Sequence, residues 1–204
     1  AADALGSENV VGVALPSRFT SEESVIDAKD LADRLRIDFR IIPIEPPFKT
    51  MLEVLSRDFA GLPPSAAEEN LQARIRGTLL MTMSNKFGWL VLTTGNKSEI
   101  STGYCTLYGD TAGGFAVIKD IPKTIVYRLS RYRNTVGPVI PDRVLEKAPT
   151  AELRANQKDT DSRPPYDVLD PILKKYVEDD LSVGEIARSG QDRKLAEQVA
   201  GLVE

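Results

Sequence analysis

Two short apolar runs near the start of the chain flank one amphipathic segment, and this order restricts the fold strongly. Val10 to Leu15 is almost entirely apolar, as is typical of a strand buried on both faces. Between Ser21 and Leu35, apolar residues recur at the spacing of one helix face. Phe39 to Ile44 predicts a second strand. Strand, helix and strand in this order predict a right-handed crossover between parallel strands.

The alternation continues along the chain. A helix is expected to open at Pro47 or Phe48, and the longest helix is expected from Ala67 to Lys86. Trp89 to Thr93 predicts a third buried strand, and another helix is expected to start at Pro122. These segments predict an α/β fold with a doubly wound, Rossmann-like parallel sheet. Three short segments then predict a small C-terminal helical appendage: residues 168–177, 183–188 and 193–202.

Two stretches are expected to be irregular. Residues 103–116 are rich in Gly, Thr and Tyr and favour a binding loop. Residues 137–165 are polar and contain five prolines, and a loop this long inside a compact domain is usually functional or mobile. No internal repeat or linker divides the chain, so residues 1–204 are interpreted as one domain.

The amino-acid composition excludes several kinds of catalytic and binding site. The chain contains no histidine, which excludes Ser-His-Asp relays and imidazole-bound metals within it. The remaining carboxylates, cations and hydroxyls suit phosphoryl or nucleotidyl transfer. A net charge of −4 gives no reason to expect nucleic-acid binding, so any anionic ligand needs a local cluster of Lys and Arg. The single cysteine, Cys105, excludes an internal disulfide, and no apolar run approaches the ~20 residues of a membrane span.

The segment ENLQARIRG places Asn70 and Arg74 four residues apart on one helix face, where both can reach one ligand, while Arg76 points elsewhere. The alternative interpretation is a solvated polar stripe. The segment TTGNKSE, from Thr93 to Glu99, follows a strand and opens a helix, a place where anions bind in α/β folds. Glu99 is a candidate Mg²⁺ ligand, or simply a first-turn residue that stabilises the helix dipole.

Other candidates are weaker when taken singly. The segment YGDTAGGF contains glycines that allow backbone amides to approach a ligand, although plain turns use the same residues. Lys123 lies at an expected helix start near this loop. Thr150 follows a proline and is equally interpretable as a helix N-cap. Cys105 is interpreted as buried filler.

In order along the chain, these blocks resemble one family. ENLQARIRGTLLMTMSNKFGWLVLTTGNKSE is followed by TGYCTLYGDTAGGFAVIKDIPKT, APTAELR and QKDTDSRPPYDVLD, with LPSRFTSEES and RIIPIEPPF upstream. Together they are similar to the synthetase domain of glutamine-dependent NAD synthetases over essentially the whole chain. The resemblance implies an ATP pyrophosphatase of the adenine nucleotide alpha hydrolase-like fold. Such enzymes adenylate nicotinic acid adenine dinucleotide with Mg-ATP, and ammonia from a glutaminase domain then converts the adenylate to NAD.

Residue roles follow from the resemblance alone. Asn70, Arg74 and Glu99 match positions that contact the dinucleotide, and Glu99 also matches the acidic position that holds Mg²⁺. The matching positions for ATP are Thr94, Lys123 and Thr150.

The resemblance assigns no definite role to three other positions. Asp110 and Arg18 are further site candidates without an assigned role. The ammonia-dependent branch has a lysine where this chain has Leu107, so that contact does not transfer.

The resemblance also predicts parts that this chain does not contain. A pyrophosphate-binding loop is expected just before Ala1, a lysine-containing segment after Glu204, and a glutaminase domain further upstream. Residues 1–204 are therefore interpreted as a partial synthetase domain with little or no activity alone. A cytoplasmic homo-oligomer is expected. Two alternatives stay open: another ATP pyrophosphatase such as GMP synthetase, and a non-catalytic nucleotide-binding module.

Overall fold

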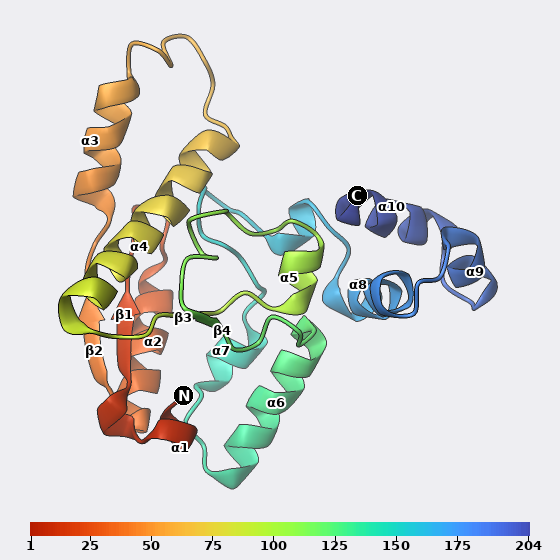
Figure 1. Ribbon diagram of the computed structural model, residues 1–204, viewed down its shortest axis with the longest axis horizontal. Coiled ribbons are helices and arrows are strands. Elements are labelled where there is room, and N and C mark those ends of the chain that lie inside the picture. Colours follow the sequence, from red (N-terminus) through yellow and green to blue (C-terminus); the bar gives the residue numbers. More distant parts are fainter.

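The computed structural model describes residues 1–204 as helices around two pairs of parallel strands (Figure 1). The first half contains α1 (Ala2–Leu5), β1 (Val11–Ala14), α2 (Glu22–Leu35), β2 (Asp38–Ile41), α3 (Glu45–Leu55) and α4 (Ala66–Phe87). The second half contains β3 (Leu92–Thr93), α5 (Lys97–Ser101), β4 (Phe115–Ala116), α6 (Lys123–Val136), α7 (Asp142–Glu146), α8 (Tyr166–Leu173), α9 (Val183–Arg188) and α10 (Arg193–Val203). No helix is both long enough and apolar enough to cross a membrane.

The predicted strand–helix–strand unit is present. β1 pairs in parallel with β2, with Val11 opposite Asp38 and Ala14 opposite Ile41. Between them lies α2, whose N-cap is Ser21; the Ser21 hydroxyl accepts a hydrogen bond from the backbone amide of Ser24. This pairing brings the carboxyl ends of both strands to one edge, where α/β folds bind ligands.

The second strand pair lies partly inside the stretch that was expected to be a loop. β3 pairs in parallel with β4, with Leu92 opposite Phe115. A Cβ added to Gly113 would lie 2.6 Å from Cγ2 of Thr93 and 2.9 Å from the carbonyl oxygen of Val91. Glycine is needed here because a side chain would push the two strands apart.

The strands are less buried than predicted. All four residues of β1 are only half-buried, the ends of β2 are exposed, and Leu90, just before β3, is 66% exposed. The expectation of strands buried on both faces was therefore wrong, because the strands form two separate two-stranded sheets whose faces are covered only in part. The third strand is also shorter than predicted, since Trp89 instead stacks on Phe87 with ring centroids 4.5 Å apart.

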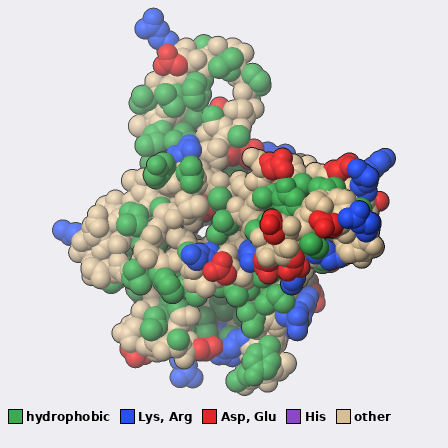
Figure 2. Space-filling view, turned by 45° about the vertical axis from the view of Figure 1, so that its right-hand side comes forward, with side chains coloured by type: hydrophobic (Ala, Val, Ile, Leu, Met, Phe, Trp, Pro, Cys, Tyr) green, Lys and Arg blue, Asp and Glu red, His purple; other side chains and the backbone are tan.

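Helix α3 starts earlier than the prolines suggested. It begins at Glu45, and Pro46 and Pro47 occupy its first turn, where a missing N–H costs no hydrogen bond. Helix α3, the loop of residues 56–65 and the first part of α4 form an arm that projects from the molecule (Figure 1). Apolar side chains gather on this arm (Figure 2), and its exposed members include Met51, Val54 and Leu62.

The apolar core has two parts. The smaller part lies between α3 and α4, at the base of the arm, and contains Ile44, Phe48 and Ile75. The larger part lies within the predicted C-terminal appendage, on the right of Figure 1. Its buried residues are Leu169, Ile172, Leu173, Ile186, Ala196 and Val199. Because α8 also contacts α5 and α6, the appendage is joined to the centre of the molecule.

Replacing a buried leucine of the C-terminal core is expected to destabilise the chain. Leu169→Ala leaves a cavity at a fully buried position, so we expect a loss of about 2–5 kcal/mol in the free energy of unfolding. Urea denaturation monitored by circular dichroism measures it. Leu62→Ala, at an exposed position on the arm, is the control and is expected to change stability by less than about 0.5 kcal/mol. Equal losses in both variants would contradict the assignment of this core.

Candidate functional site

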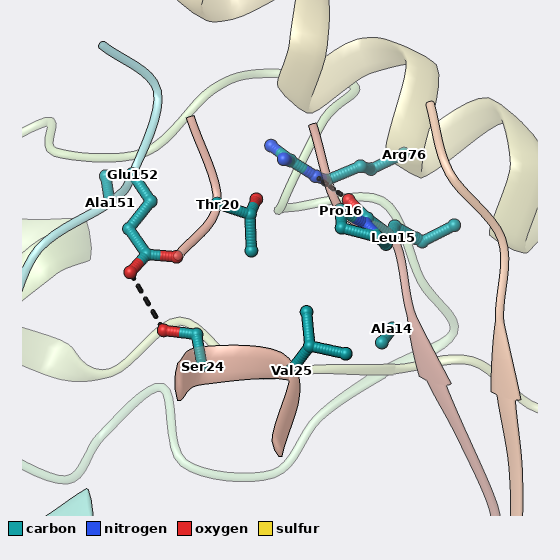
Figure 3. A pocket seen from close by; sticks show the side chains of 9 residues that line it. All are labelled: Ala14, Leu15, Pro16, Thr20, Ser24, Val25, Arg76, Ala151 and Glu152. Carbon is teal, nitrogen blue, oxygen red and sulfur yellow. Dashed lines mark hydrogen bonds between the residues drawn. The ribbon is translucent and has the colours of Figure 1, made fainter. Parts of the chain in front are cut away.

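A cavity of about 200 Å³ lies at the carboxyl end of β1 (Figure 3). Four segments form its wall: the end of β1 and the nearby start of α2, and, distant from these in sequence, the middle of α4 and the loop before α8. The lining residues are Ala14, Leu15, Pro16, Thr20, Ser24, Val25, Arg76, Ala151 and Glu152. Both charges in this wall, Arg76 and Glu152, are residues that sequence reasoning did not select.

Arg76 reaches the cavity from α4, and Figure 3 shows its side chain beside the end of β1. Its Nε donates a hydrogen bond of 2.9 Å to the carbonyl oxygen of Leu15. Burial lowers the pKa of Arg76 from its ordinary value, and the charge of Glu152 opposes this shift. The guanidinium is therefore held by the strand end, with its terminal nitrogens available to a ligand.

Glu152 enters the cavity from the opposite side (Figure 3). Its Oε1 accepts hydrogen bonds from Ser21, Ser24 and Lys147 at 2.8–2.9 Å. Burial alone would raise the pKa of this carboxyl, but the bonds from Lys147, Ser24 and Ser21 outweigh burial and lower it. The backbone of Glu152 has a φ of 50°, a region that L-residues seldom adopt. The three hydrogen bonds to its side chain hold Glu152 in this uncommon conformation.

Thr150 lies two residues before Glu152. Its hydroxyl accepts a hydrogen bond of 3.2 Å from the amide of Glu152, and no helix begins here. The interpretation of Thr150 as a helix N-cap was therefore wrong. The hydroxyl instead stabilises the turn that brings the wall of the cavity into place.

Glu99 and Lys123 form a second cluster, at the starts of α5 and α6. Lys123 Nζ lies 3.2 Å from Glu99 Oε1, and each side chain is only about 20% exposed (19% and 21%). The other Glu99 oxygen accepts from the backbone amide of Asn96, and the Asn96 side chain accepts from the amide of Glu99. This reciprocal capping box means that the dipole-stabilising role and the ion pair are both present.

An aromatic and charged group adjoins this pair. Lys123 Nζ lies 5.6 Å from the ring centre of Tyr166, and the Arg163 guanidinium lies over the rings of Tyr104 (3.7 Å) and Tyr166 (4.8 Å). Arg163 and the Tyr166 hydroxyl both donate to Asp159, at 2.6 and 2.7 Å. Burial and the charge of Asp159 raise the pKa of Tyr104 to about 12, so it stays protonated at neutral pH. Sequence reasoning missed this group, although all but Tyr104 lie within the block QKDTDSRPPYDVLD.

Asn70 and Arg74 both contact the glycine-rich loop, which comprises residues 103–116. Asn70 Oδ1 accepts a 2.8 Å hydrogen bond from the Thr106 hydroxyl, and Arg74 Nε donates to the carbonyl oxygen of Leu107 at 3.3 Å. The same loop is braced by Asp110, whose carboxylate accepts from the amide of Thr106 at 2.6 Å. The two α4 residues thus meet one segment, as their spacing predicts.

The loop reaches α4 because both surfaces contain glycine. A Cβ on Gly77 would lie 2.7 Å from the carbonyl oxygen of Gly109, and a Cβ on Gly109 would lie 2.8 Å from Cβ of Ala73. Side chains at either position would force the loop away from the helix.

The remaining candidates lie apart from these clusters. Thr94 is exposed directly after β3. Arg18 pairs with Glu45 at the start of α3, and its guanidinium lies 5.6 Å from the ring centre of Phe48. Arg18 thus has a structural partner. It does not line the cavity.

No three His, Cys, Asp or Glu side chains come together in a group that could hold a metal ion. Glu99 could supply one carboxylate oxygen. This fits the mode in which Mg²⁺ takes one or two carboxylates and receives its other ligands from phosphates and water. Lys123 would have to release that oxygen first.

Comparisons with known proteins agree with one another. A family model described as NAD synthase matches residues 1–204. A glutamine-dependent NAD(+) synthetase of Thermotoga maritima is 56% identical over 205 residues, which cover 100% of this chain and 36% of that protein. The chain spans 36–38% of the length of the curated relatives it matches.

Solved structures share the fold. A glutamine-dependent NAD+ synthetase of Acinetobacter baumannii, in complex with ADP, has a TM-score of 0.70 and 49% identity, covering 100% of this chain and 36% of that one. An NMN synthetase of Francisella tularensis has a TM-score of 0.77 and 25% identity, covering 95% and 72%. The predicted α/β class is confirmed by these likenesses and by the parallel strands.

Removing the charge of Glu152 is expected to destabilise the chain in a pH-dependent way. The pKa of this carboxyl is lowered in the folded chain, so its contribution is present above the ordinary value of 4.5 and is lost as the pH falls through the lower, folded value. Glu152→Gln should cost about 1–3 kcal/mol at pH 7, and the difference from wild type should shrink below pH 4.5. Urea denaturation at pH 3–7 checks this, with exposed Glu146→Gln as the control. A pH-independent difference would contradict it.

Proposed function

This chain belongs to the NAD synthase family, and we propose that it is part of the synthetase domain of a glutamine-dependent NAD synthetase. The observation that carries the proposal is the match of all residues 1–204 to one family, together with 56% identity to a relative of that name. Residues 1–204 would then be one partial domain of a longer enzyme. We further propose that this enzyme works in the cytoplasm as a homo-oligomer, and the exposed apolar side chains of the α3–α4 arm support self-association.

The proposed reaction has two steps. The carboxylate of nicotinic acid adenine dinucleotide attacks the α-phosphate of ATP, which forms an acyl adenylate and releases pyrophosphate. Ammonia, derived from glutamine, then attacks the acyl carbon, loses a proton and expels AMP, which leaves the amide of NAD. The chemistry needs cations near phosphates and a site that positions two nucleotides, and it needs no histidine.

We place ATP between the cavity at the end of β1 and the Glu99–Lys123 pair. The cavity lies at a strand's carboxyl end, where α/β folds bind nucleotides, and Thr150 stabilises its wall. Lys123, as a compact cation, would contact phosphate oxygens, and exposed Thr94 would contact the nucleotide at the end of β3. Arg76 adds a buried cation that reaches the cavity from α4.

We place the dinucleotide against α4 and the glycine-rich loop, with Asn70, Arg74 and Glu99 as its contacts. The Arg74 guanidinium uses its Nε for the carbonyl oxygen of Leu107, so its two terminal nitrogens can grip a phosphate or carboxylate. Asp110 would act indirectly, because it holds the loop through Thr106.

Magnesium enters the proposal through Glu99. When bound, Mg²⁺ would neutralise phosphate charge and make pyrophosphate a better leaving group. Glu99 would turn from Lys123 toward the metal, and Lys123 would turn toward the phosphates. One salt bridge would thus be replaced by two charge-neutralising contacts.

The two alternatives are less well supported. Another ATP pyrophosphatase, such as GMP synthetase, would share the cavity but has no use for the paired α4 side chains, Asn70 and Arg74. A non-catalytic module would bind ATP and no dinucleotide. The identity to named NAD synthetases favours the proposed reaction over both.

Loss of Arg74 is expected to weaken dinucleotide binding. Arg74→Ala removes a charge-assisted contact, so the Kd of nicotinic acid adenine dinucleotide, measured by calorimetry, should rise at least about tenfold. Exposed Arg188→Ala removes an equal charge elsewhere and should leave the Kd unchanged. If both variants bind like wild type, the dinucleotide site does not include Arg74.

The substrate that supports pyrophosphate release distinguishes an NAD synthetase from a GMP synthetase. In the full-length protein, pyrophosphate release from ATP is expected to require nicotinic acid adenine dinucleotide. Xanthosine monophosphate should fail to support release, and nicotinic acid mononucleotide should support it poorly. Release with xanthosine monophosphate would favour the GMP synthetase alternative. ATP binding without release under any condition would favour the non-catalytic module.

A further inference from the structure

The carboxylate of Asp170 lies where three helices meet. It projects from α8, is 6% exposed and accepts three hydrogen bonds. One oxygen accepts from the Ser98 hydroxyl on α5 at 2.5 Å. The other accepts from the backbone amide and the hydroxyl of Thr124 on α6, at 2.8 and 2.7 Å. A single side chain thus joins the C-terminal helices to the starts of α5 and α6.

Helix α6 depends on this arrangement for its first turn. The first N–H groups of a helix have no partner within the helix. The residue before α6 is Pro122, which provides no side-chain cap, and the first turn contains no acidic residue. The amide of Lys123 instead donates to the Ser98 hydroxyl at 2.9 Å, and the amide of Thr124 donates to Asp170. The cap of α6 is therefore supplied from α5 and α8.

The residues of this capping network include Lys123 and the residue next to Glu99. Ser98 precedes Glu99, and Lys123 itself donates its amide to this network. The network therefore sets the backbone positions from which the Glu99 and Lys123 side chains meet at 3.2 Å. We propose that Asp170 is a positioning residue: it holds the backbone of α5 and α6 so that the side chains of Glu99 and Lys123 lie where they can act on ATP. This inference rests on the function proposed above, in which Lys123 contacts the ATP phosphates.

An amide side chain could not replace the carboxylate. Every partner of Asp170 is a donor: two hydroxyls and one N–H. Asparagine would direct its NH₂ group at one of them and leave a buried donor without a partner, which is costly. The negative charge also faces the positive end of the α6 dipole. Asp170→Asn is therefore a near-isosteric change that disrupts the network.

The test uses the full-length protein and asks whether Asp170 acts through Lys123. The probe is Mg-ATP, with steady-state release of pyrophosphate in the presence of nicotinic acid adenine dinucleotide. We expect Asp170→Asn to raise the KM for ATP about tenfold or more. Asp167→Asn is the matched control, because Asp167 is exposed on the same helix, and it should leave the KM unchanged. Ser98→Ala, which retains the bonds between Asp170 and Thr124, should raise the KM less and serves if Asp170→Asn folds poorly.

A double-variant cycle separates positioning from a general loss of structure. If Asp170 acts through Lys123, adding Asp170→Asn to Lys123→Ala should raise the KM for ATP no further. Effects that multiply in the double variant would overturn the proposal. So would an unchanged KM in both Asp170→Asn and Ser98→Ala.

A readout without activity distinguishes this inference from the proposed function. Amide hydrogen exchange of Lys123 and Thr124 should be faster in Asp170→Asn and unchanged in Asp167→Asn. If the wild-type protein releases no pyrophosphate, the proposed function fails, while faster exchange would still show that Asp170 holds the start of α6. Unchanged exchange would overturn the inference whatever the activity.

Discussion

The hydrogen bonds of the buried Asp170 carboxylate join the C-terminal helices to the rest of this molecule. The larger apolar core lies within the C-terminal helices, and the strands and the cavity lie elsewhere. Van der Waals packing of α8 brings the two parts into contact, but packing is not directional and does not fix how α8 is oriented relative to α5 and α6. The three bonds to Ser98 and Thr124 do so, because each requires a short distance and a direction. The Glu99–Lys123 pair has its geometry from this connection.

The charges of the candidate site are all engaged with protein groups. Glu99 pairs with Lys123, Glu152 with Lys147, Arg76 with a strand carbonyl and Arg74 with a loop carbonyl. A chain with a net charge of −4 can bind two polyanionic nucleotides only through such local cations. Their internal partners avoid the cost of half-buried, unpaired charge. In the proposed function, a phosphate would replace Glu99 beside Lys123, while Arg74 and Arg76 would keep their carbonyl partners and bind through their terminal nitrogens.

Much of the fold could be predicted from sequence. The strand–helix–strand unit, the long α4 and the three closing helices are all present. The shared face of Asn70 and Arg74 followed from helical spacing, and both residues contact the glycine-rich loop. The depth of strand burial was predicted wrongly, because apolar character alone does not reveal how many neighbours a strand has. The roles assigned to the site residues stay predictions from the family resemblance.

The sequence by itself determined the order of elements and the chemical groups available, since periodicity acts over a few residues. It also determined the family, because long ordered blocks carry that signal. Only the tertiary structure decided which groups meet. Arg76 and Leu15 are 61 residues apart, Ser98 and Asp170 are 72 apart, and Ser24 and Glu152 are 128 apart. Contacts over such separations leave no local pattern, because the folding of the whole chain, and not the spacing of neighbours, sets their distance.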